Sequence, residues 1–315
     1  MTESDARFGI AGGLDVLVVG YASIDRVWRA GSRPSPGRTA ILEGPVEPAP
    51  TFGGCGPNVA VELARLGLRT ALVTWLGDDA DGRAYLAYLA SAGVDLAAVH
   101  VEPGQASPRT ILVYDPDGGA TCLYHPSGSR DQRLSDAGRT AAGAARVLAL
   151  TVCPARLTVE LLDTRRADAL VTWNVKADAD AYPPELRARL LREARLVCLN
   201  RDELAFIADS EVPTAFEAAG AAIEMLPVAP DAIVALTLGP SGSLVWTAGT
   251  TAHVAADLVE VADPTGAGDA YFAGFVAALI GGRSPIEAAR AATRHAAAYL
   301  RAKASAAAGL ASARR

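Results

Sequence analysis

Lysine is the scarcest charged residue in this 315-residue chain, where it occurs only at Lys176 and Lys303. Acidic residues outnumber lysine and arginine by 35 to 29, and the net charge is −6. A chain with this balance lacks the basic surface by which proteins hold nucleic acid or anionic membranes. Long apolar runs are missing too, since none reaches the about 20 residues that a membrane-spanning helix needs. We therefore expect a protein that binds neither nucleic acid nor membrane.

Cysteine is also sparse, and its four residues are too far apart to form a C-x-x-C pair. This spacing indicates neither a zinc site nor a small disulfide framework. The first residues, MTESDARFG, are polar and acidic, unlike a secretory signal peptide. We therefore expect a cytoplasmic protein whose thiols stay reduced. The four cysteines are Cys55, Cys122, Cys153 and Cys198.

Half of the residues are apolar, which is enough for one large core. Compact runs rich in Val and Leu, such as residues 14–20 and 70–77, have the character of buried strands. They alternate with stretches such as 56–67 and 183–194 that fit helices. Strand–helix alternation predicts an α/β fold with a doubly wound, mainly parallel sheet covered on both faces. We expect residues 1–315 to form a single domain of this kind.

Two β-rich segments interrupt the alternation, at about 27–52 and about 105–126. Prolines punctuate the first segment, which suggests loops or edge strands. The second reads as a hairpin around Asp117-Gly118. We expect the two segments to pair into one small sheet that acts as a lid.

The stretch DPTGAGDAYFAGF (263–275) places a glycine-rich turn before an apolar helix. Backbone N–H groups and the positive end of the helix make such a turn a ready anion site. Neither lysine lies in a G-x-x-x-x-G-K-[ST] loop or a V-A-I-K strand, which excludes P-loop and protein-kinase chemistry. A dinucleotide fingerprint is excluded because Tyr271 stands where the third glycine is required. What remains is an anion site with Asp269 beside it, where Asp269 is either a reactive carboxylate or a helix cap.

Several segments together resemble the ribokinase-like (PfkB) carbohydrate kinases. FGGCGPNVAVELARLG (52–67) is similar to the first signature of that family, and DPTGAGDAYFAGF to the second. NRDE (200–203) and TLGPSG (237–242) occur between them in the order of the family, and the resemblance covers roughly residues 14–303. It implies a doubly wound body with a small β lid. The implied reaction transfers the γ-phosphoryl group of ATP to a hydroxyl of a sugar, nucleoside or similar small molecule.

The resemblance assigns the catalytic roles to the second signature. Asp269 matches the catalytic base of the family, and Gly266, Ala267 and Gly268 match its anion hole. The alternative for the glycines is a turn that needs positive φ, and the two interpretations are compatible. Asp263 and Thr265 match positions that hold a monovalent cation in ribokinase-type members, which makes K⁺ a candidate cofactor.

The resemblance also implies a site for Mg²⁺. Asn200 and Glu203 match the N-x-x-E motif, which organises Mg²⁺ and its waters around the phosphates. The same two residues fit a capping box at a helix start, which is the alternative interpretation.

Four residues are implied in nucleotide binding. Thr237, Gly239 and Gly242 match the nucleotide-binding turn, and the alternative is an ordinary hairpin corner. Thr293 stands near the adenine position, where the family often has Asn.

Substrate contacts are implied for Asp25, Gly53, Gly54 and Asn58, because polar side chains and bare backbone suit a polyol. Asp25 alone also fits a solvated residue at a strand end. Cys55 occupies a position where sugar and sugar-phosphate kinases often have Lys. A neutral residue there argues against a phosphorylated substrate, which would need a cation.

The first hypothesis is therefore an ATP-dependent, Mg²⁺-requiring phosphotransferase for an unphosphorylated sugar or sugar derivative. A nucleoside kinase is the second, with Trp28, Phe52 and Tyr124 near the lid either stacking on a base or packing the lid. A non-catalytic sugar or nucleotide sensor on the same fold is the third, against which the intact Asp269 counts. The resemblance further suggests a homodimer that forms through the lid.

Overall fold

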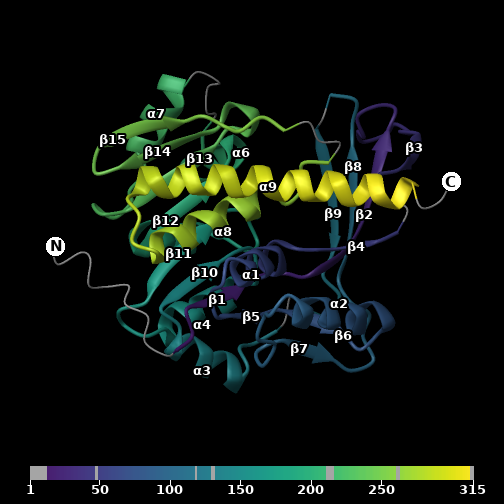
Figure 1. Cartoon of the computed structure of the whole chain (residues 1–315), viewed down its shortest axis with the longest axis horizontal. Helices are drawn as coiled ribbons and strands as arrows, with labels where there is room; N and C mark the ends of the chain where they lie inside the picture. The colour runs from purple at the N-terminus through teal and green to yellow at the C-terminus, as the bar shows by residue number, and fades with distance from the viewer. Residues whose placement is uncertain are drawn as a thin grey trace.

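The computed structural model describes residues 13–46, 49–117, 119–128, 132–210, 216–259 and 263–312. Residues 47, 48 and 118 of the two β-rich segments, including Gly118 of the expected hairpin turn, lie outside this described part. The described chain forms a large sheet, helices on both of its faces, and a separate small sheet (Figure 1). Within these residues no helix combines the length and apolarity needed to cross a membrane.

The large sheet has eight strands in the order β15-β14-β13-β12-β11-β10-β1-β5. Six are parallel, and β14 and β15 add an antiparallel edge. The order runs outward in both directions from β1 and β10, and ligands of such sheets bind at the carboxyl ends of the strands near this switch point. The bounds are Val16–Val19 (β1), Thr70–Val73 (β5), Val147–Leu150 (β10), Leu170–Asn174 (β11), Ala194–Leu199 (β12), Ile233–Thr237 (β13), Ser243–Thr247 (β14) and Thr250–Val254 (β15).

Helices cover both faces of this sheet, as alternate residues of β1 show. Leu17 and Val19 belong to one core cluster and Val16 and Val18 to the other. The first core packs against α3 (Asp136–Ala144), α4 (Ala155–Thr164), α5 (Pro184–Glu193), α6 (Arg201–Ala208) and α7 (Phe216–Glu224). The second packs against α1 (Cys55–Arg65), α2 (Ala80–Ser91), α8 (Ala267–Ile280) and α9 (Pro285–Ser312). The expected doubly wound α/β fold is confirmed.

Helix α8 is apolar nearly all round, because it lies between the sheet, α1 and α9. Helix α9 follows it and runs along the molecule toward the small sheet (Figure 1). At the start of α9, both the backbone N–H and the hydroxyl of Ser284 donate to the Glu287 carboxylate.

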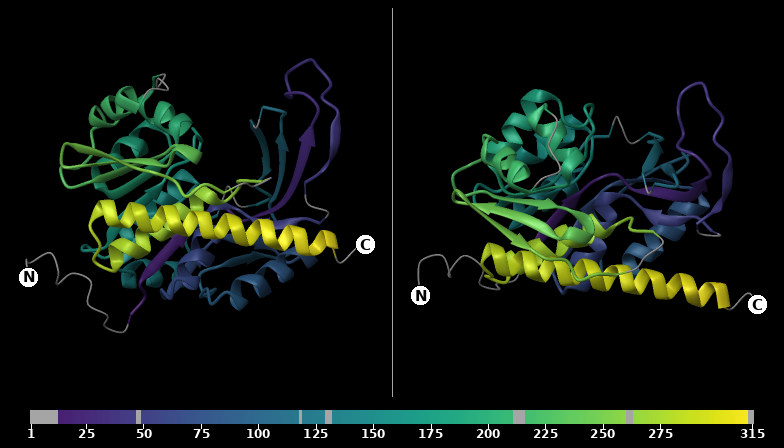
Figure 2. Two further views of the ribbon diagram at one scale, coloured as in Figure 1. Left: turned by 45° about the horizontal axis from the view of Figure 1, so that its top comes forward. Right: turned by 90° about the horizontal axis from the view of Figure 1, so that it is seen from above.

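The small sheet joins segments that are far apart in the sequence (Figure 2). Its order is β3-β2-β8-β9, with β4 also paired to β2. The pairing of β2 with β8 is parallel and links the two β-rich segments directly. The bounds are Ser23–Ala30 (β2), Leu42–Pro45 (β3), Thr51–Gly53 (β4), Arg109–Tyr114 (β8) and Ala120–His125 (β9).

The single strand expected over 70–77 is divided in two. The chain leaves the large sheet after Val73, and Trp75–Gly77 (β6) pairs with His100–Glu102 (β7) in a two-stranded sheet. The sequence pattern is apolar throughout because both pieces are buried, so it carries no signal for the change of partner.

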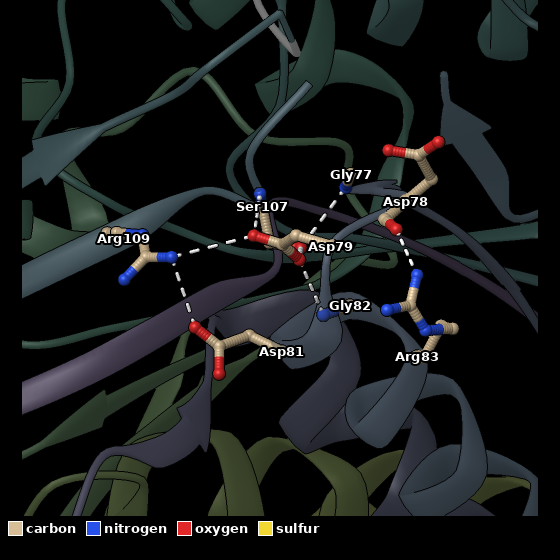
Figure 3. Close-up of polar contacts among 8 residues, drawn as sticks. All are labelled: Gly77, Asp78, Asp79, Asp81, Gly82, Arg83, Ser107 and Arg109. Carbon is tan, nitrogen blue, oxygen red and sulfur yellow. Dashed lines mark hydrogen bonds and ion pairs between the residues drawn. The ribbon is translucent and has the colours of Figure 1, made fainter. Parts of the chain in front are cut away.

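Polar contacts attach the start of β8 to the loop before α2 (Figure 3). Asp79 caps α2 by accepting from the N–H of Gly82 at 2.8 Å. Its carboxylate also accepts from the Ser107 N–H at 3.0 Å and the Ser107 hydroxyl at 2.7 Å. Arg109 adds an exposed ion pair to Asp81 at 3.1 Å. The small sheet is therefore anchored where β8 begins.

Candidate active site

The predicted site residues follow the carboxyl ends of the parallel strands. Asn200 comes directly after β12, and Thr237 ends β13. Asp25 lies in β2, which follows β1 after a short connection. Because parallel strands present their carboxyl ends at one edge of a sheet, side chains distant in sequence meet there.

Asp269 is the third residue of α8, and its side chain is buried. The Asn58 side-chain amide donates to Asp269 Oδ2 at 2.9 Å, and the Asn174 amide donates to Oδ1 at 3.0 Å. Asn58 comes from α1 and Asn174 from the last position of β11. Asp269 is not the side-chain cap of α8, because the N-cap position belongs to Gly266.

Burial raises the pKa of Asp269. The Lys176 ammonium and the hydrogen bonds from Asn58 and Asn174 oppose that effect, yet the pKa stays above its usual range. Lys176 Nζ lies 3.2 Å from a carboxylate oxygen of Glu203. A carboxylate with a raised pKa is a better proton acceptor than an exposed one, and the amides fix its direction.

Sequence reasoning missed Asn174 and Lys176, although both lie in the segment TWNVK. The available signal was their position at the end of a buried parallel strand, where site residues gather. The known phosphate-loop motifs gave no signal for Lys176, because it lies outside them.

Glycine is required at Gly266 for two reasons. Its φ is 87°, in the left-handed region, and a Cβ there would lie 2.3 Å from the hydroxyl of Tyr299. The turn interpretation is therefore confirmed at Gly266. A Cβ at Gly268 would meet no atom within 4 Å, so open space adjoins this glycine. The N–H of Ala267 is already bonded to the carbonyl of Pro264 at 3.1 Å.

A cavity of about 640 Å³ adjoins this helix start. All four predicted nucleotide-binding residues line it together with Ala267 and Gly268, and its size suits a nucleotide. The hydroxyl of Thr293 is buried and has no hydrogen-bond partner among the described residues. An unpaired buried hydroxyl is costly, so it is a candidate to bond a ligand. The four residues are Thr237, Gly239, Gly242 and Thr293.

Asp25 and the Gly53-Gly54 backbone form the predicted substrate side. A Cβ at Gly53 would lie 1.8 Å from Asp25 Oδ2, so only bare backbone fits against this carboxylate. Burial raises the pKa of Asp25 to about 6, against hydrogen bonds from Ser23 and Thr110. Burial, together with the charges of Asp269 and Asp25, also raises the pKa of the Cys55 thiol. Cys55 therefore lies near both carboxylates.

The residues predicted for cations occupy two places. Asn200 and Glu203 form the capping box at the start of α6, with bonds of 2.9 Å and 2.7 Å. Asp263 accepts from the Thr265 N–H at 2.9 Å and from the Lys303 ammonium at 2.6 Å. Within the described residues no group of three or more His, Cys, Asp or Glu side chains forms a metal site.

The aromatic side chains near the small sheet differ in their surroundings. Phe52 stacks on Tyr85 with a centroid distance of 4.5 Å, which is internal packing. Tyr124 lies beside Tyr21 at 5.1 Å and lines a cavity of about 320 Å³ with residues of the large body.

The fold and the site define a class of protein. A cavity of nucleotide size beside the carboxyl end of β13, a glycine open to that cavity and a buried aspartate at the same helix start are features of phosphotransferases for small molecules. Residues 14–310 match the family described as pfkB family carbohydrate kinase, and the chain belongs to this family. It is an ATP-dependent kinase of small molecules.

Curated relatives differ in their named substrates. A nucleoside kinase from Methanothermobacter thermautotrophicus is 25% identical over 85% of this chain and 83% of its own length. A fructokinase from Klebsiella pneumoniae is 30% identical over 72% of this chain and 76% of its own length. An ATP-dependent ribose-1-phosphate kinase from Halopiger xanaduensis is 31% identical over 71% and 72%.

Solved structures agree in the fold. Ribokinase from Cryptococcus neoformans in complex with ADP has a TM-score of 0.77 at 23% identity, covering 89% of this chain and 91% of that one. Arabidopsis thaliana ribokinase, complexed with ribose and ATP, has a TM-score of 0.76 at 22% identity, covering 92% and 93%.

Proposed function

We propose that this kinase transfers the γ-phosphoryl group of ATP to a hydroxyl of an unphosphorylated sugar or sugar derivative, with Asp269 as the base. The observation that carries this proposal is the position of Asp269. Two amide donors hold its buried carboxylate at the start of α8, where the open side of Gly268 adjoins a nucleotide-sized cavity.

In the proposed reaction the acceptor hydroxyl attacks the γ-phosphorus of ATP. A bond forms between the hydroxyl oxygen and phosphorus, and the bond from phosphorus to the bridging oxygen breaks to release ADP. The hydroxyl proton passes to the Asp269 carboxylate. Asn58 and Asn174 contribute by aiming that carboxylate, because positioning supplies most of the rate in phosphoryl transfer.

The nucleotide is proposed to occupy the cavity lined by Thr237, Gly239, Gly242 and Thr293. Its triphosphate would approach Gly268, because this is the glycine with open space beside it. Its base would lie toward Thr293, whose unpaired hydroxyl can donate to a ring nitrogen of adenine or accept from its exocyclic amine.

The proposed metal is Mg²⁺, held by the phosphates and by water bonded to Glu203. The carboxylate of Glu203 uses one oxygen for the Asn200 N–H and the other for Lys176. Each oxygen keeps a lone pair, so the residue fits a contact to metal-bound water. When bound, Mg²⁺ would neutralise charge on the phosphates.

The identity of the acceptor rests on the substrate side of the site. Asp25, Asn58 and the Gly53-Gly54 backbone offer hydrogen bonds to hydroxyl groups, which supports a polyol. Cys55 is neutral, which supports an unphosphorylated acceptor. Lys176 lies near Cys55, however, and its positive charge would favour a phosphorylated one. A nucleoside is the second candidate, because Tyr124 has an open cavity beside it whereas Phe52 is committed to Tyr85.

A screen of ATP consumption tests the proposal. Sugars, sugar phosphates and nucleosides are offered to the wild-type chain and to the Asp269→Asn variant. Turnover of at least one unphosphorylated sugar, lost in the variant, is expected. Tight binding of a sugar or nucleotide without turnover of any acceptor would instead support a sensor.

We also propose that two copies pair through the small sheet. Ile111 and Leu123 are directly opposite on β8 and β9, and both are exposed, as are Leu42 at the start of the outer strand β3 and Ile41 before it. Such apolar groups on one sheet suit a second copy of the same sheet. The proposed location is the cytoplasm, where ATP is available and the thiols stay reduced.

A further inference from the structure

Both lysines of the chain lie beside carboxylates at the candidate site. Lys176 pairs with Glu203, and Lys303 of α9 pairs with Asp263, directly before the glycine-rich turn. The Lys303 ammonium is 2.6 Å from Asp263 Oδ2 and 3.0 Å from the backbone carbonyl oxygen of Thr265. One compact cation thus binds one carboxylate oxygen and one carbonyl oxygen of the same turn.

With Lys303 bound, both carboxylate oxygens of Asp263 have hydrogen-bond partners. Its other oxygen accepts from the Tyr114 hydroxyl and the Thr265 N–H, each at 2.9 Å. The Asp263 side chain is 8% exposed, and an anion buried to that extent needs a positive partner. Burial raises the pKa of Asp263, but the bonds from Lys303 and Thr265 outweigh this and leave it below its usual range.

Potassium does not fit at Asp263 and Thr265 while Lys303 is bound there. A monovalent cation would need the oxygens that the ammonium already holds, and a second positive charge at that distance would repel it. The family resemblance, which assigned these two residues to a monovalent cation, therefore disagrees with the contacts in this chain.

We propose that Lys303 is a built-in replacement for the monovalent cation and makes phosphoryl transfer by this kinase independent of potassium. The inference rests on the proposed function in one respect, that the turn before α8 serves phosphoryl transfer. An ammonium group is a compact point charge with three donors, unlike the planar guanidinium, which explains a lysine at this position in a chain whose basic residues are mostly arginines.

The position of Lys303 in α9 makes this cation permanent. Tyr299, one helical turn earlier, also reaches the turn, with its hydroxyl 3.4 Å from the Thr265 carbonyl oxygen. Residues four apart on one helix face thus hold the turn together. Because Lys303 is covalently attached, its local concentration does not depend on the salt around the protein.

The test compares potassium chloride with tetramethylammonium chloride at equal ionic strength, using wild type, Lys303→Met and the control Arg301→Met. Arg301 lies on the same helix but is exposed. Wild type and the control should keep the same kcat/KM within about twofold in both salts, because ionic strength is matched. Lys303→Met should lose about tenfold or more in tetramethylammonium, because Asp263 is left without its partner, and potassium or ammonium should restore activity.

The melting temperature provides a second reading that needs no turnover. Potassium should raise the melting temperature of Lys303→Met and leave that of wild type unchanged, because only the variant has a cation site to fill. Failure to find any acceptor would count against the proposed function but would leave this reading intact. Activation of the wild type by potassium would overturn the inference, as would a Lys303→Met variant that matches wild type in activity and melting temperature in every salt.

Discussion

Gly266 and Gly268 are two residues apart, but glycine is needed at them for different reasons. Gly266 has a left-handed backbone and lies against Tyr299, so a side chain there would disturb the fold. Gly268 has room for a side chain, and that room belongs to the cavity proposed for ATP. Replacement of one glycine of this turn by alanine can therefore affect either folding or binding, depending on the position.

Gly268→Ala should leave the fold intact and impair phosphoryl transfer. Alanine is the better helix former, so the free energy of unfolding should be unchanged or rise by up to about 1 kcal/mol. The methyl group would enter the phosphate position and lower kcat/KM by about 100-fold. Gly143→Ala is the matched control, since Gly143 is also helical with open space around it, far from the site. Equal kcat/KM in both variants would contradict the placement of the phosphates.

Asn174→Ala should move the acid limb of the pH profile. The Asp269 carboxylate must be ionised to take a proton, so activity is lost as the pH falls through its raised pKa. The Asn174 amide lowers that pKa, and its removal should raise the pKa further and shift the acid limb of kcat/KM to higher pH. Thr172→Val removes a hydrogen bond from the same strand and should leave the limb in place. An unmoved limb in Asn174→Ala would argue against Asp269 as the group that titrates.

Among the elements, the alternation of strands and helices and the helix starts could be predicted best from the sequence. The first signature became α1, and the glycine-rich turn became the start of α8, because apolar spacing and glycine positions are local properties. The division of residues 70–77 into β5 and β6 could not be predicted, since both pieces are equally apolar and the choice of partner is tertiary. The same limit applies to Asn174, whose contact with Asp269 joins residues 95 positions apart.

Asp79→Ala should weaken the anchor between the small sheet and the body. Asp79 caps α2 and holds both polar groups of Ser107, so its loss should cost about 1–3 kcal/mol in the free energy of unfolding measured in urea. Its pKa is lowered in the fold, so this stabilisation is present above the pKa of the unfolded chain and fades as the pH falls through the folded value. The exposed ion pair of Asp81 provides the control, and Asp81→Ala should cost within about 0.5 kcal/mol. Similar losses in the two variants would contradict the anchor.

At the scale of the whole molecule, the candidate site depends on parts from both ends of the chain. Tyr114 of the small sheet and Lys303 of the C-terminal helix both contact Asp263. The family and the fold could be predicted because the two signatures and the alternation of strands and helices depend on residues that are close together in the sequence. The contact of Lys303 could not, because it depends on where a 28-residue helix passes the turn.

Leu123→Asp should disrupt the proposed pairing through the small sheet. Leu123 is exposed on β9, so a charge there should not affect folding but would be buried and unpaired in a dimer. Sedimentation should find dimers of the wild type and monomers of the variant at the same concentration. Leu66→Asp, at an exposed apolar residue after α1, is the control and should remain dimeric. A monomeric wild type would remove this part of the account.

The most direct test of the central claim is transfer of labelled γ-phosphoryl from ATP in a single turnover with enzyme in excess. Wild type should form a labelled phosphate ester of the acceptor, and Asp269→Asn should do so about 100- to 10,000-fold more slowly, because the base is removed. ATP affinity should be unchanged in the variant, since Asp269 faces the acceptor. Ester formation by Asp269→Asn at the wild-type rate would show that Asp269 is not the base.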